Sequence, residues 1–540
     1  MAKKPSEINP IELEVFRNRF AAICEEMGAD LGRSAFSPNI KERRDYSCAV
    51  FDAKGQLVAQ AAHIPVHLGS MALSVRAAIR AFRMRRGDTV ILNDPYRGGT
   101  HLPDITLVAP VFLGKDSRPA FFVANRAHHS DVGGQSPGSM ALASSLEDEG
   151  VVIPPTLLEK KGKKNSVFLK KFLKQVRRPE ERTADLEAQL SANRCGNARL
   201  QELVAGYGPM KVRAAMRAYR RYEERITLAA LKKIPSGLYR FEDFLDDDGF
   251  TAATIKIAVA IRVSSRGVSV DFSGSDAQVR GPVNATVAIT YSATAYAFRC
   301  LVVALTGEDC LSMRPIQIRT RKGSVVDARY PAPVAGGNVE TSQRLVDVLF
   351  GALGIALPHL IPAASQGTMN NVAFGNERFT YYETLAGGIG ASPKGPGLNA
   401  THSHMTNTLN TPIEALENEL PLRVGSYRLR RGSAGKGKFS GGEGLVREYL
   451  FLEDTSVSML SDRRVTRPYG RQGGAPGCPG ANWLTNADPQ SNPPRLALKL
   501  PSKFERVFKS GETLRIVTPG GGGYGSPSPK ASIGSRTKTL

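Results

Sequence analysis

The chain has 540 residues, of which 41% are hydrophobic, and this length exceeds one ordinary hydrophobic core, so two to four domains are expected. No apolar run reaches the ~18 residues of a membrane-spanning helix, and the segment Met1–Pro5 is not followed by the apolar stretch of a secretory signal. Six scattered cysteines without a Cys-x-x-Cys pair argue against a disulfide framework and indicate reduced thiols. We therefore expect a cytoplasmic protein without membrane contact.

The net charge of +22, from 72 lysines and arginines against 50 acidic residues, bears on the choice of partner. The basic residues concentrate in Lys160–Arg178, in Arg428–Lys438 and after Pro527. A nucleic-acid binder usually interleaves aromatic residues with its basic ones or carries a recognisable module. Here only Phe168 and Phe172 do so. A solvated basic insertion and a loose tail are therefore favoured over nucleic-acid binding, while an acidic partner subunit or an anionic substrate stays open.

Hydrophobic periodicity predicts both helices and strands along the chain. Apolar residues at helical spacing predict helices over 10–31, 71–84, 284–306 and 344–357. Short apolar or alternating runs predict strands at 48–51, 90–92, 105–112, 120–124, 255–261 and 268–272, with more strands and turns over 422–524. A long periodic stretch over 185–233 predicts a helical hairpin broken at Gly206–Pro209.

These elements predict a mixed α+β fold of several domains. We expect an N-terminal α/β region that bears a metal site (1–184), the helical hairpin (185–233), a β-rich middle region (234–345), a glycine-rich C-terminal region of strands (346–525) and a disordered basic tail (526–540). The glycine pairs have neither the Lys-Ser/Thr ending of a Walker A loop nor a clear strand–GxGxxG–helix setting. Gly520–Gly525 is therefore interpreted as a tight turn, and the chain by itself is not expected to bind ATP.

Five of the eight histidines lie between His63 and His129, and three of them stand beside acidic residues and glycine pairs. In His101-x-x-Asp104 both side chains converge on one ion if the segment is a turn that leads into a strand. His128 and His129 are adjacent, so in an extended segment they point to opposite faces and only one of them serves as a metal ligand. Imidazoles and carboxylates beside tight turns are typical of metal-assisted hydrolases.

A structural role is the better interpretation of any single histidine, whereas the group favours a metal site. Asp45 is a further candidate ligand because it directly precedes an apolar strand. His67 is interpreted as a substrate-side or a structural residue, as is His63, and His402 and His404 are candidates for the same site. The chain has no Gly-x-Ser-x-Gly elbow and no cysteine near a histidine, so metal-activated chemistry is the leading mechanism.

At these residues the chain resembles the hydantoinase B/5-oxoprolinase family, which includes B subunits of N-methylhydantoinases and is related to subunits of acetone and acetophenone carboxylases. The matching stretches follow one order through most of the chain: Glu42–Ala49, His63–Met71, Asn93–Asp104, Ala127–Gly134, Asp271–Ser275, Gly281–Ala285, Pro331–Thr341, His404–Thr408 and Thr518–Gly525. The chain departs from the family at 307–313, where an Asn-x-Gly-rich loop is usual, before Gly441–Gly442, where an arginine is missing, and in 392–399, where an Asp is missing. These positions are expected to shape the contacts with the substrate, so the departures bear on the identity of the substrate.

The resemblance implies a division of labour between two subunits in a hetero-oligomer. A larger hydantoinase A-type subunit, similar to sugar kinases, is expected to bind ATP and Mg²⁺. This chain is expected to hold a divalent Zn²⁺, Mn²⁺ or Fe²⁺ through Asp45, His101, Asp104 and His128. Catalytic roles near that ion are expected for His129, Asp131 and His67.

We therefore expect the B subunit of an ATP-dependent amidohydrolase that opens a cyclic amide of the hydantoin or 5-oxoproline type. Two alternatives stay open: a subunit of an ATP-dependent ketone carboxylase, and a non-catalytic scaffold subunit with a structural metal.

Overall fold

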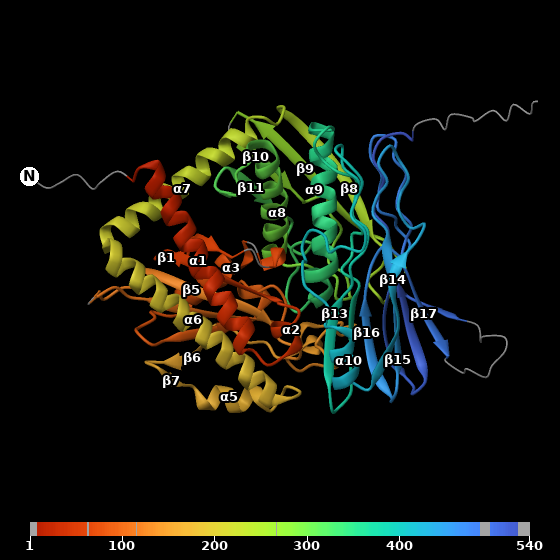
Figure 1. The fold of residues 1–540 in the computed structure, drawn as a ribbon, viewed down its shortest axis with the longest axis horizontal. Coiled ribbons are helices and arrows are strands. Elements are labelled where there is room, and N and C mark those ends of the chain that lie inside the picture. Colours follow the sequence, from red (N-terminus) through yellow and green to blue (C-terminus); the bar gives the residue numbers. More distant parts are fainter. Residues whose placement is uncertain are drawn as a thin grey trace, which may run out of the picture.

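The computed structural model describes residues 8–61, 64–67, 69–114, 116–265, 267–486 and 497–527. Figure 1 shows a helix-rich N-terminal part beside a middle region, with the strands of the C-terminal part on the far side. The helices are α1 (Pro10–Ser34), α2 (Pro38–Lys41), α3 (Ser70–Ala81), α4 (Leu146–Glu149), α5 (Ser166–Leu173), α6 (Pro179–Tyr207), α7 (Pro209–Leu231), α8 (Val287–Thr306), α9 (Ser342–Ala356) and α10 (Ile413–Glu419). Three short helical turns are η1 (Pro65–His67), η2 (Pro95–Arg97) and the π-helical η3 (Gly337–Thr341).

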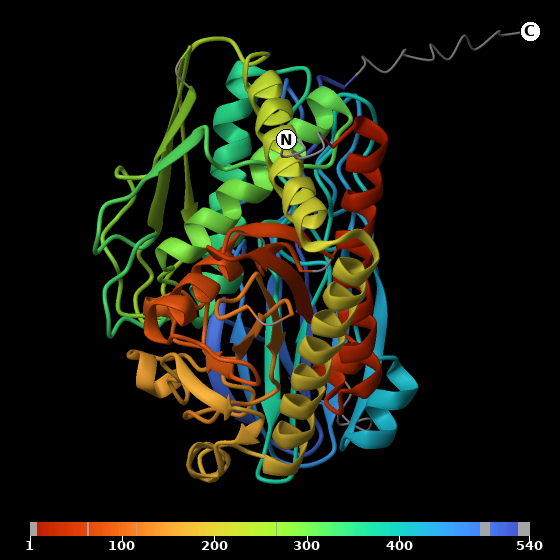
Figure 2. The ribbon, with the colours of Figure 1, turned by 90° about the vertical axis from the view of Figure 1, so that its left-hand side faces the viewer.

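The N-terminal part is built around a seven-stranded antiparallel sheet in the order β2-β1-β5-β4-β3-β6-β7. Its strands are β1 (Tyr46–Asp52), β2 (Leu57–Gln60), β3 (Thr89–Leu92), β4 (Asp104–Val111), β5 (Phe121–His128), β6 (Thr156–Lys160) and β7 (Lys163–Lys164). Helices α1 and α6 pack on one face and α3 packs on the other (Figure 2). Because both faces are covered, β5 is buried along its whole length, and its sequence is a continuous apolar run at its start. The predicted strands at 90–92, 105–112 and 120–124 are confirmed as β3, β4 and β5.

The predicted helical stretch 185–233 is confirmed as α6 and α7, which meet at Gly208. The break follows from the positive φ of 79° at Gly208 and from the proline that begins α7. Figure 1 shows that the two helices diverge in an open V, with α6 along α1 and α7 directed toward α8.

The basic segment Lys160–Arg178 is folded rather than a solvated insertion, because it contains β7 and α5. Phe172 is buried in the core beside Leu186 and Leu190 of α6. Phe172 of this segment therefore fills the core and the partly buried Phe168 packs against it, so these aromatic side chains do not form a nucleic-acid surface with the basic residues.

The middle region is a four-stranded sheet in the order β11-β10-β9-β8, covered by α8 and α9. Its strands are β8 (Gly237–Leu245), β9 (Ile255–Ser264), β10 (Gly267–Asp271) and β11 (Ile316–Arg319), and only the β10–β11 pair is parallel. Helix α8 is long and apolar enough to span a membrane, which corrects the expectation that no such run exists. Most of α8 is buried in the core of this region, so its composition fits a core helix.

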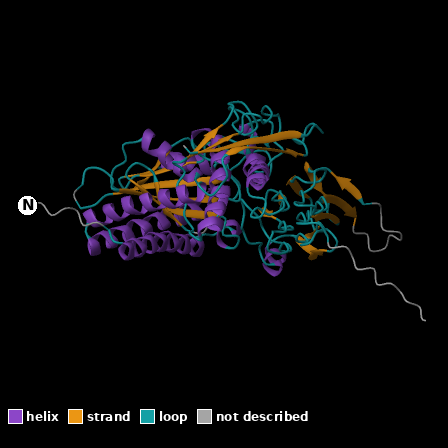
Figure 3. Cartoon of the chain, turned by 90° about the horizontal axis from the view of Figure 1, so that it is seen from above, coloured by secondary structure: helices purple, strands orange, loops and turns teal. Residues whose placement is uncertain are grey.

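The C-terminal part contains two antiparallel sheets, in the orders β13-β12-β16-β19 and β14-β15-β20-β17-β18, around a shared core. Figure 3 shows these strands at the end of the molecule away from the long helices. The strands are β12 (Asn371–Gly375), β13 (Thr380–Thr384), β14 (Leu422–Arg430), β15 (Gly444–Phe451), β16 (Thr455–Leu460), β17 (Ala481–Asn486), β18 (Leu498–Leu500), β19 (Lys503–Phe508) and β20 (Glu512–Val517).

The glycine-rich segments of this part pack backbone against backbone. A Cβ atom at Gly388 or Gly441 would overlap main-chain atoms of Gly521. The amides of Gly520, Gly521, Gly522 and Gly523 all donate to backbone carbonyls of other segments, at 2.8–3.2 Å. These amides are therefore not available to cradle a phosphate, in agreement with the sequence interpretation.

The predicted mixed α+β fold of several regions is confirmed. The divisions at residues 184, 233, 345 and 525 remain predictions, and the expected basic tail lies outside the described residues from residue 528 onward.

The packing of α6 against α1 and β1 is tested by Leu200→Ala. Leu200 is fully buried in this core, so we expect the substitution to lower the free energy of unfolding by about 2–5 kcal/mol. Leu228→Ala on α7 is the matched control, because this leucine is 37% exposed and its truncation should cost far less. Urea unfolding followed by circular dichroism measures both, and equal losses would contradict the assigned core.

Candidate metal centre

The candidate metal centre lies at one edge of the N-terminal sheet. Asp104 is the first residue of β4 and His128 is the last residue of β5, and the antiparallel register pairs them directly. Directly opposed residues project from the same face with Cβ atoms about 5 Å apart. Asp45 precedes β1 on the other side of β5, and its carbonyl oxygen accepts a hydrogen bond from the His128 amide at 2.9 Å. The register of the sheet therefore brings three of the four predicted ligands to one place.

The fourth predicted ligand, His101, lies on the loop between η2 and β4. The Asn93 side chain holds this loop by donating to the carbonyl oxygens of Leu102 at 2.8 Å and Val151 at 2.9 Å. Gly99 lies against the main chain of Asn93 so closely that a Cβ atom would overlap its carbonyl oxygen. A glycine is therefore required at this position if His101 is to reach the edge of the sheet.

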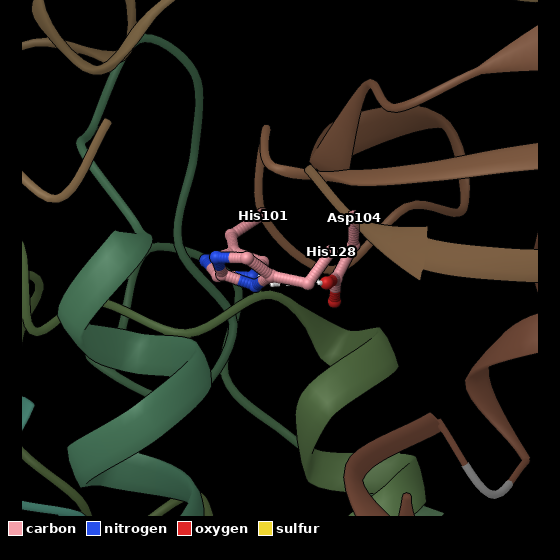
Figure 4. Close-up of side chains that lie close together, drawn as sticks. All are labelled: His101, Asp104 and His128. Carbon is pink, nitrogen blue, oxygen red and sulfur yellow. Dashed lines mark ion pairs between the residues drawn. The ribbon is translucent and has the colours of Figure 1, made fainter. Parts of the chain in front are cut away.

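Figure 4 shows His101, Asp104 and His128 gathered at the start of β4. His101 Nε2 lies 3.2 Å and His128 Nδ1 lies 3.4 Å from Asp104 Oδ1, and ligand atoms of the three residues all lie within 4.8 Å of one another. All three side chains are buried. Asp45 Oδ2 lies 4.0 Å from His128 Nδ1, at the margin of the cluster. The structure therefore brings three of the predicted ligands together and places Asp45 beside them.

Several donor atoms of this cluster have no hydrogen-bond partner outside the cluster among the described residues. Asp104 Oδ1, both ring nitrogens of His101 and Nε2 of His128 are buried without a hydrogen bond from the described residues. Such atoms are normally satisfied, because each unpaired buried group costs about 1–3 kcal/mol. A divalent cation would satisfy them together, and two imidazoles with one or two carboxylates are donors suited to Zn²⁺, Mn²⁺ or Fe²⁺. The residues present therefore fit the predicted ion.

The second oxygen of Asp104 is occupied by the protein. Thr100 Oγ1 donates to Asp104 Oδ2 at 2.6 Å, and His67 Nε2 lies 3.3 Å from the same oxygen. His67 Nδ1 lies 2.9 Å from Ser47 Oγ on β1. Because both ring nitrogens of His67 have partners, this residue orients the Asp104 carboxylate.

The electrostatics of the cluster favour ligands in their metal-binding forms. Burial alone would raise the pKa of Asp104, but the neighbouring His101 and His67 rings hold that pKa well below its usual range. Burial lowers the pKa of His128, so its imidazole is neutral at neutral pH. A carboxylate and a neutral imidazole are the forms that coordinate a cation.

An aromatic ring from the C-terminal part closes the site. Tyr382 on β13 stacks on His128 with 4.7 Å between ring centroids and 9° between ring planes, and the Arg43 guanidinium lies 4.8 Å from the same Tyr382 centroid. The Tyr382 hydroxyl donates to Asn371 Oδ1 at 2.8 Å, and Asn371 Nδ2 donates to Glu340 Oε1 at 2.7 Å. The ring of His128 is thus held by a chain of contacts that reaches β12 and η3.

Two residues expected near the ion lie elsewhere. His129 turns to the opposite side of β5, where its Nε2 lies 2.9 Å from Gln189 Oε1 on α6. Asp131 accepts a hydrogen bond from the Gly133 amide and forms an ion pair with Arg177 at 3.0 Å. The side chains of His129 and Asp131 therefore contact other parts of the protein and do not join the cluster, and their catalytic roles remain predictions.

The remaining candidate residues from the sequence are His63, His402 and His404. His63 lies outside the described residues. His402 and His404 do not join the metal cluster and instead line a separate cavity. The sequence interpretation missed Tyr382, because a tyrosine on a distant strand gives no signal of the histidine on which it will stack.

The chain is similar to known proteins over nearly its whole length. A sequence-family profile described as Hydantoinase B/oxoprolinase matches residues 9–527. An uncharacterised protein of Methanocaldococcus jannaschii is 38% identical over 96% of this chain and 91% of its own length. The 5-oxoprolinase 1 of Arabidopsis thaliana is also 38% identical over 96% of this chain, but this chain spans only 42% of that protein. The structure of an ATP-dependent caprolactamase from Pseudomonas jessenii, 24% identical, matches 96% of this chain and 92% of its own with a TM-score of 0.87, which shows a shared fold.

The Tyr382 stack is tested by metal binding. We expect Tyr382→Leu to weaken binding of Zn²⁺ or Mn²⁺ by about 10–100-fold, because His128 loses the ring that orients it. Tyr382→Phe keeps the stack and should stay close to the wild type. Phe379→Leu, a similar truncation of a buried aromatic residue just before β13 but in the neighbouring C-terminal core, is the matched control. Titration against a chelator measures each affinity, and equal affinities for the leucine variants would contradict an orienting role.

The buried Glu340 makes stability depend on pH. Burial, aided by the charge of Asp462, raises the pKa of Glu340 to about 8 from an ordinary 4.5, so the folded state holds the proton more tightly than the unfolded state. Its contribution to stability is fully present below about pH 4.5 and is lost as the pH rises through about 8. Glu340→Gln should flatten this decline by an amount on the order of a few kcal/mol.

Urea unfolding between pH 5 and pH 8.5 measures the effect of Glu340→Gln, with Glu419→Gln on the exposed end of α10 as the matched control. A wild type whose decline with pH equals that of Glu340→Gln would show that Glu340 is not the titrating group.

Proposed function

The chain belongs to the hydantoinase B/oxoprolinase family, and on this premise we propose that it is the metal-bearing subunit of an ATP-dependent enzyme that opens a cyclic amide. The observation that carries the proposal is the buried set of His101, Asp104 and His128, whose ligand atoms lie within 4.8 Å of one another and whose side chains include four atoms without a hydrogen bond from the described residues. Hydrolysis of a stable amide needs an activated carbonyl and a positioned water, and such a donor set supports both needs.

The residues of the chain divide the work around this centre. His101, Asp104 and His128 would hold a Zn²⁺, Mn²⁺ or Fe²⁺ ion, with Asp45 as a fourth ligand or as a base for water at the margin. When bound, such an ion polarises a carbonyl and lowers the pKa of a coordinated water. His67 keeps Asp104 oriented through its contact with Oδ2. These contacts support a positioning role for His67, while the catalytic role expected from the sequence remains a prediction.

ATP is proposed to come from a partner of the hydantoinase A type. The amides of the Gly520–Gly523 segment are occupied by carbonyl oxygens and do not form a phosphate site. This chain spans 42% of the 5-oxoprolinase 1 of Arabidopsis thaliana, and the caprolactamase that shares its fold is ATP-dependent; both support a second subunit that binds ATP in a hetero-oligomer. Transfer of the γ-phosphoryl group of ATP to the amide oxygen there, with Mg²⁺ and release of ADP, would make the amide carbon more electrophilic. Addition of water to that carbon and cleavage of its bond to the ring nitrogen, which takes up a proton, would leave an open-chain acyl phosphate, and a second water would release phosphate from it.

The proposal is tested by His101→Ala in the complex with the A-type subunit. We expect the variant to lose more than about 100-fold in metal affinity and in ATP-dependent ring opening, because a direct ligand contributes more to metal affinity than a residue that only orients a ligand. His359→Ala, at an exposed position after α9, is the matched control and should retain both. Elemental analysis gives the metal content, and chromatography of the opened amide gives the turnover with hydantoin, lactams and 5-oxoproline.

Three results would contradict the proposal. Metal and turnover retained in His101→Ala would show that the ligands are wrong. Consumption of ATP only with a ketone and bicarbonate would identify a carboxylase subunit. A metal retained without any ATP-dependent turnover in the complex would favour a scaffold subunit.

A further inference from the structure

A cavity of about 350 Å³ opens between α8, α9 and the segment His402–His404. Its walls are apolar, with Leu301 from α8, Phe350 from α9 and Ile361 from the segment after α9. None of the described residues that line it is an aspartate, glutamate, lysine or arginine. An apolar chamber with a few polar groups is typical of small-molecule sites in proteins.

The polar groups of this cavity are uncharged. Burial, with the charge of Arg43 as a second cause, lowers the pKa of His402 to about 4, and burial lowers that of His404 to about 4, so at neutral pH each ring is a neutral imidazole. Both ring nitrogens of His402 are buried without a hydrogen bond from the described residues, so this ring offers the one donor and one acceptor that the C=O and N–H of an amide require, whereas His404 Nε2 lies 3.8 Å from Asp347 Oδ1. The Ser403 hydroxyl is also buried without a hydrogen bond from the described residues. These groups can pair with an amide, but they supply no cation for a carboxylate.

The cavity shares one loop with the metal centre. The His402–His404 end of this loop lines the cavity, and further along the Met405 carbonyl oxygen accepts a hydrogen bond from Val66, the neighbour of His67, at 3.1 Å. Thr408 Oγ1 lies 3.4 Å from the Arg43 guanidinium beside Asp45. His404 stands in the loop at a φ of 55°, a conformation that a non-glycine residue rarely adopts. The same loop therefore lines the cavity at one end and contacts residues next to His67 and Asp45 at the other.

We propose that this cavity holds the ring of an uncharged cyclic amide and excludes rings that carry a carboxylate. Burying an ionised carboxylate without a cationic partner is costly, whereas an uncharged lactam or hydantoin loses little on entering an apolar chamber. The assignment of this ligand as substrate rests on the proposed function. It narrows that function toward lactams and hydantoins and away from 5-oxoproline.

The experiment compares 2-pyrrolidone with 5-oxoproline, which differ only in the carboxylate. Ligand-observed NMR on the full chain, without ATP or partner, should show 2-pyrrolidone binding at least about tenfold more tightly. Ala304→Trp places a large ring at the mouth of the cavity and should abolish binding. Val303→Trp, at the adjacent exposed position of α8 outside the lining, is the matched control and should bind as the wild type does. Circular dichroism checks that both variants fold.

Equal affinities for the two rings would overturn the exclusion of carboxylates. Binding of 2-pyrrolidone that survives in Ala304→Trp, or that is undetectable in the wild type at millimolar concentrations, would overturn the location. These outcomes are independent of the proposed function, which requires the metal, ATP and the partner. Preferred turnover of 5-oxoproline by the complex would overturn this inference and leave the proposed amidohydrolase function standing. Binding of 2-pyrrolidone in the cavity without any turnover by the complex would leave this inference standing and overturn the proposed function.

Discussion

The structure depends on the cost of burying His101, Asp104 and His128 together in a water-poor interior. Their donor atoms face one another without hydrogen-bond partners among the described residues, which costs free energy unless a cation joins them. The sheet register, the loop held by Asn93 and the close packing at Gly99 all serve to keep this arrangement in place. Stability and the capacity to bind an ion are therefore linked in the same residues.

The C-terminal part completes a site whose proposed ligands lie in the N-terminal part. Tyr382 covers His128, and the loop from His402 to Thr408 touches the Arg43 segment on one side and forms a cavity wall on the other. The ligands alone would define an ion site with no selection of substrate. The middle and C-terminal regions supply the walls of the cavity beside His402. Because no charged side chain lines this cavity among the described residues, we propose that it favours uncharged substrates over charged ones.

Much of the local structure could be predicted from the sequence, because it depends on short-range patterns. Apolar runs located β3, β4 and β5, helical spacing located α3, α8 and α9, and the Gly208-Pro209 pair located the break between α6 and α7. Contacts between distant segments could not be predicted in this way. The basic segment at 160–178 looked solvated, although Phe172 packs into the core, because a charge count carries no information about which face of a helix is covered.

By itself the sequence determined the residue types and spacing of the candidate site: the turn that carries His101 and Asp104, and the alternation that lets only one of His128 and His129 face it. Only the tertiary structure decided which one. Pairing β5 between β1 and β4 turns His128 toward Asp104 and His129 toward Gln189, and a shift of one residue in register would have exchanged them. Arg43, Tyr382 and the loop after His402 come from segments hundreds of residues apart. They meet through hydrogen bonds of the buried Arg43 guanidinium to Tyr382, Thr384 and Thr408, which no local pattern in the sequence predicts.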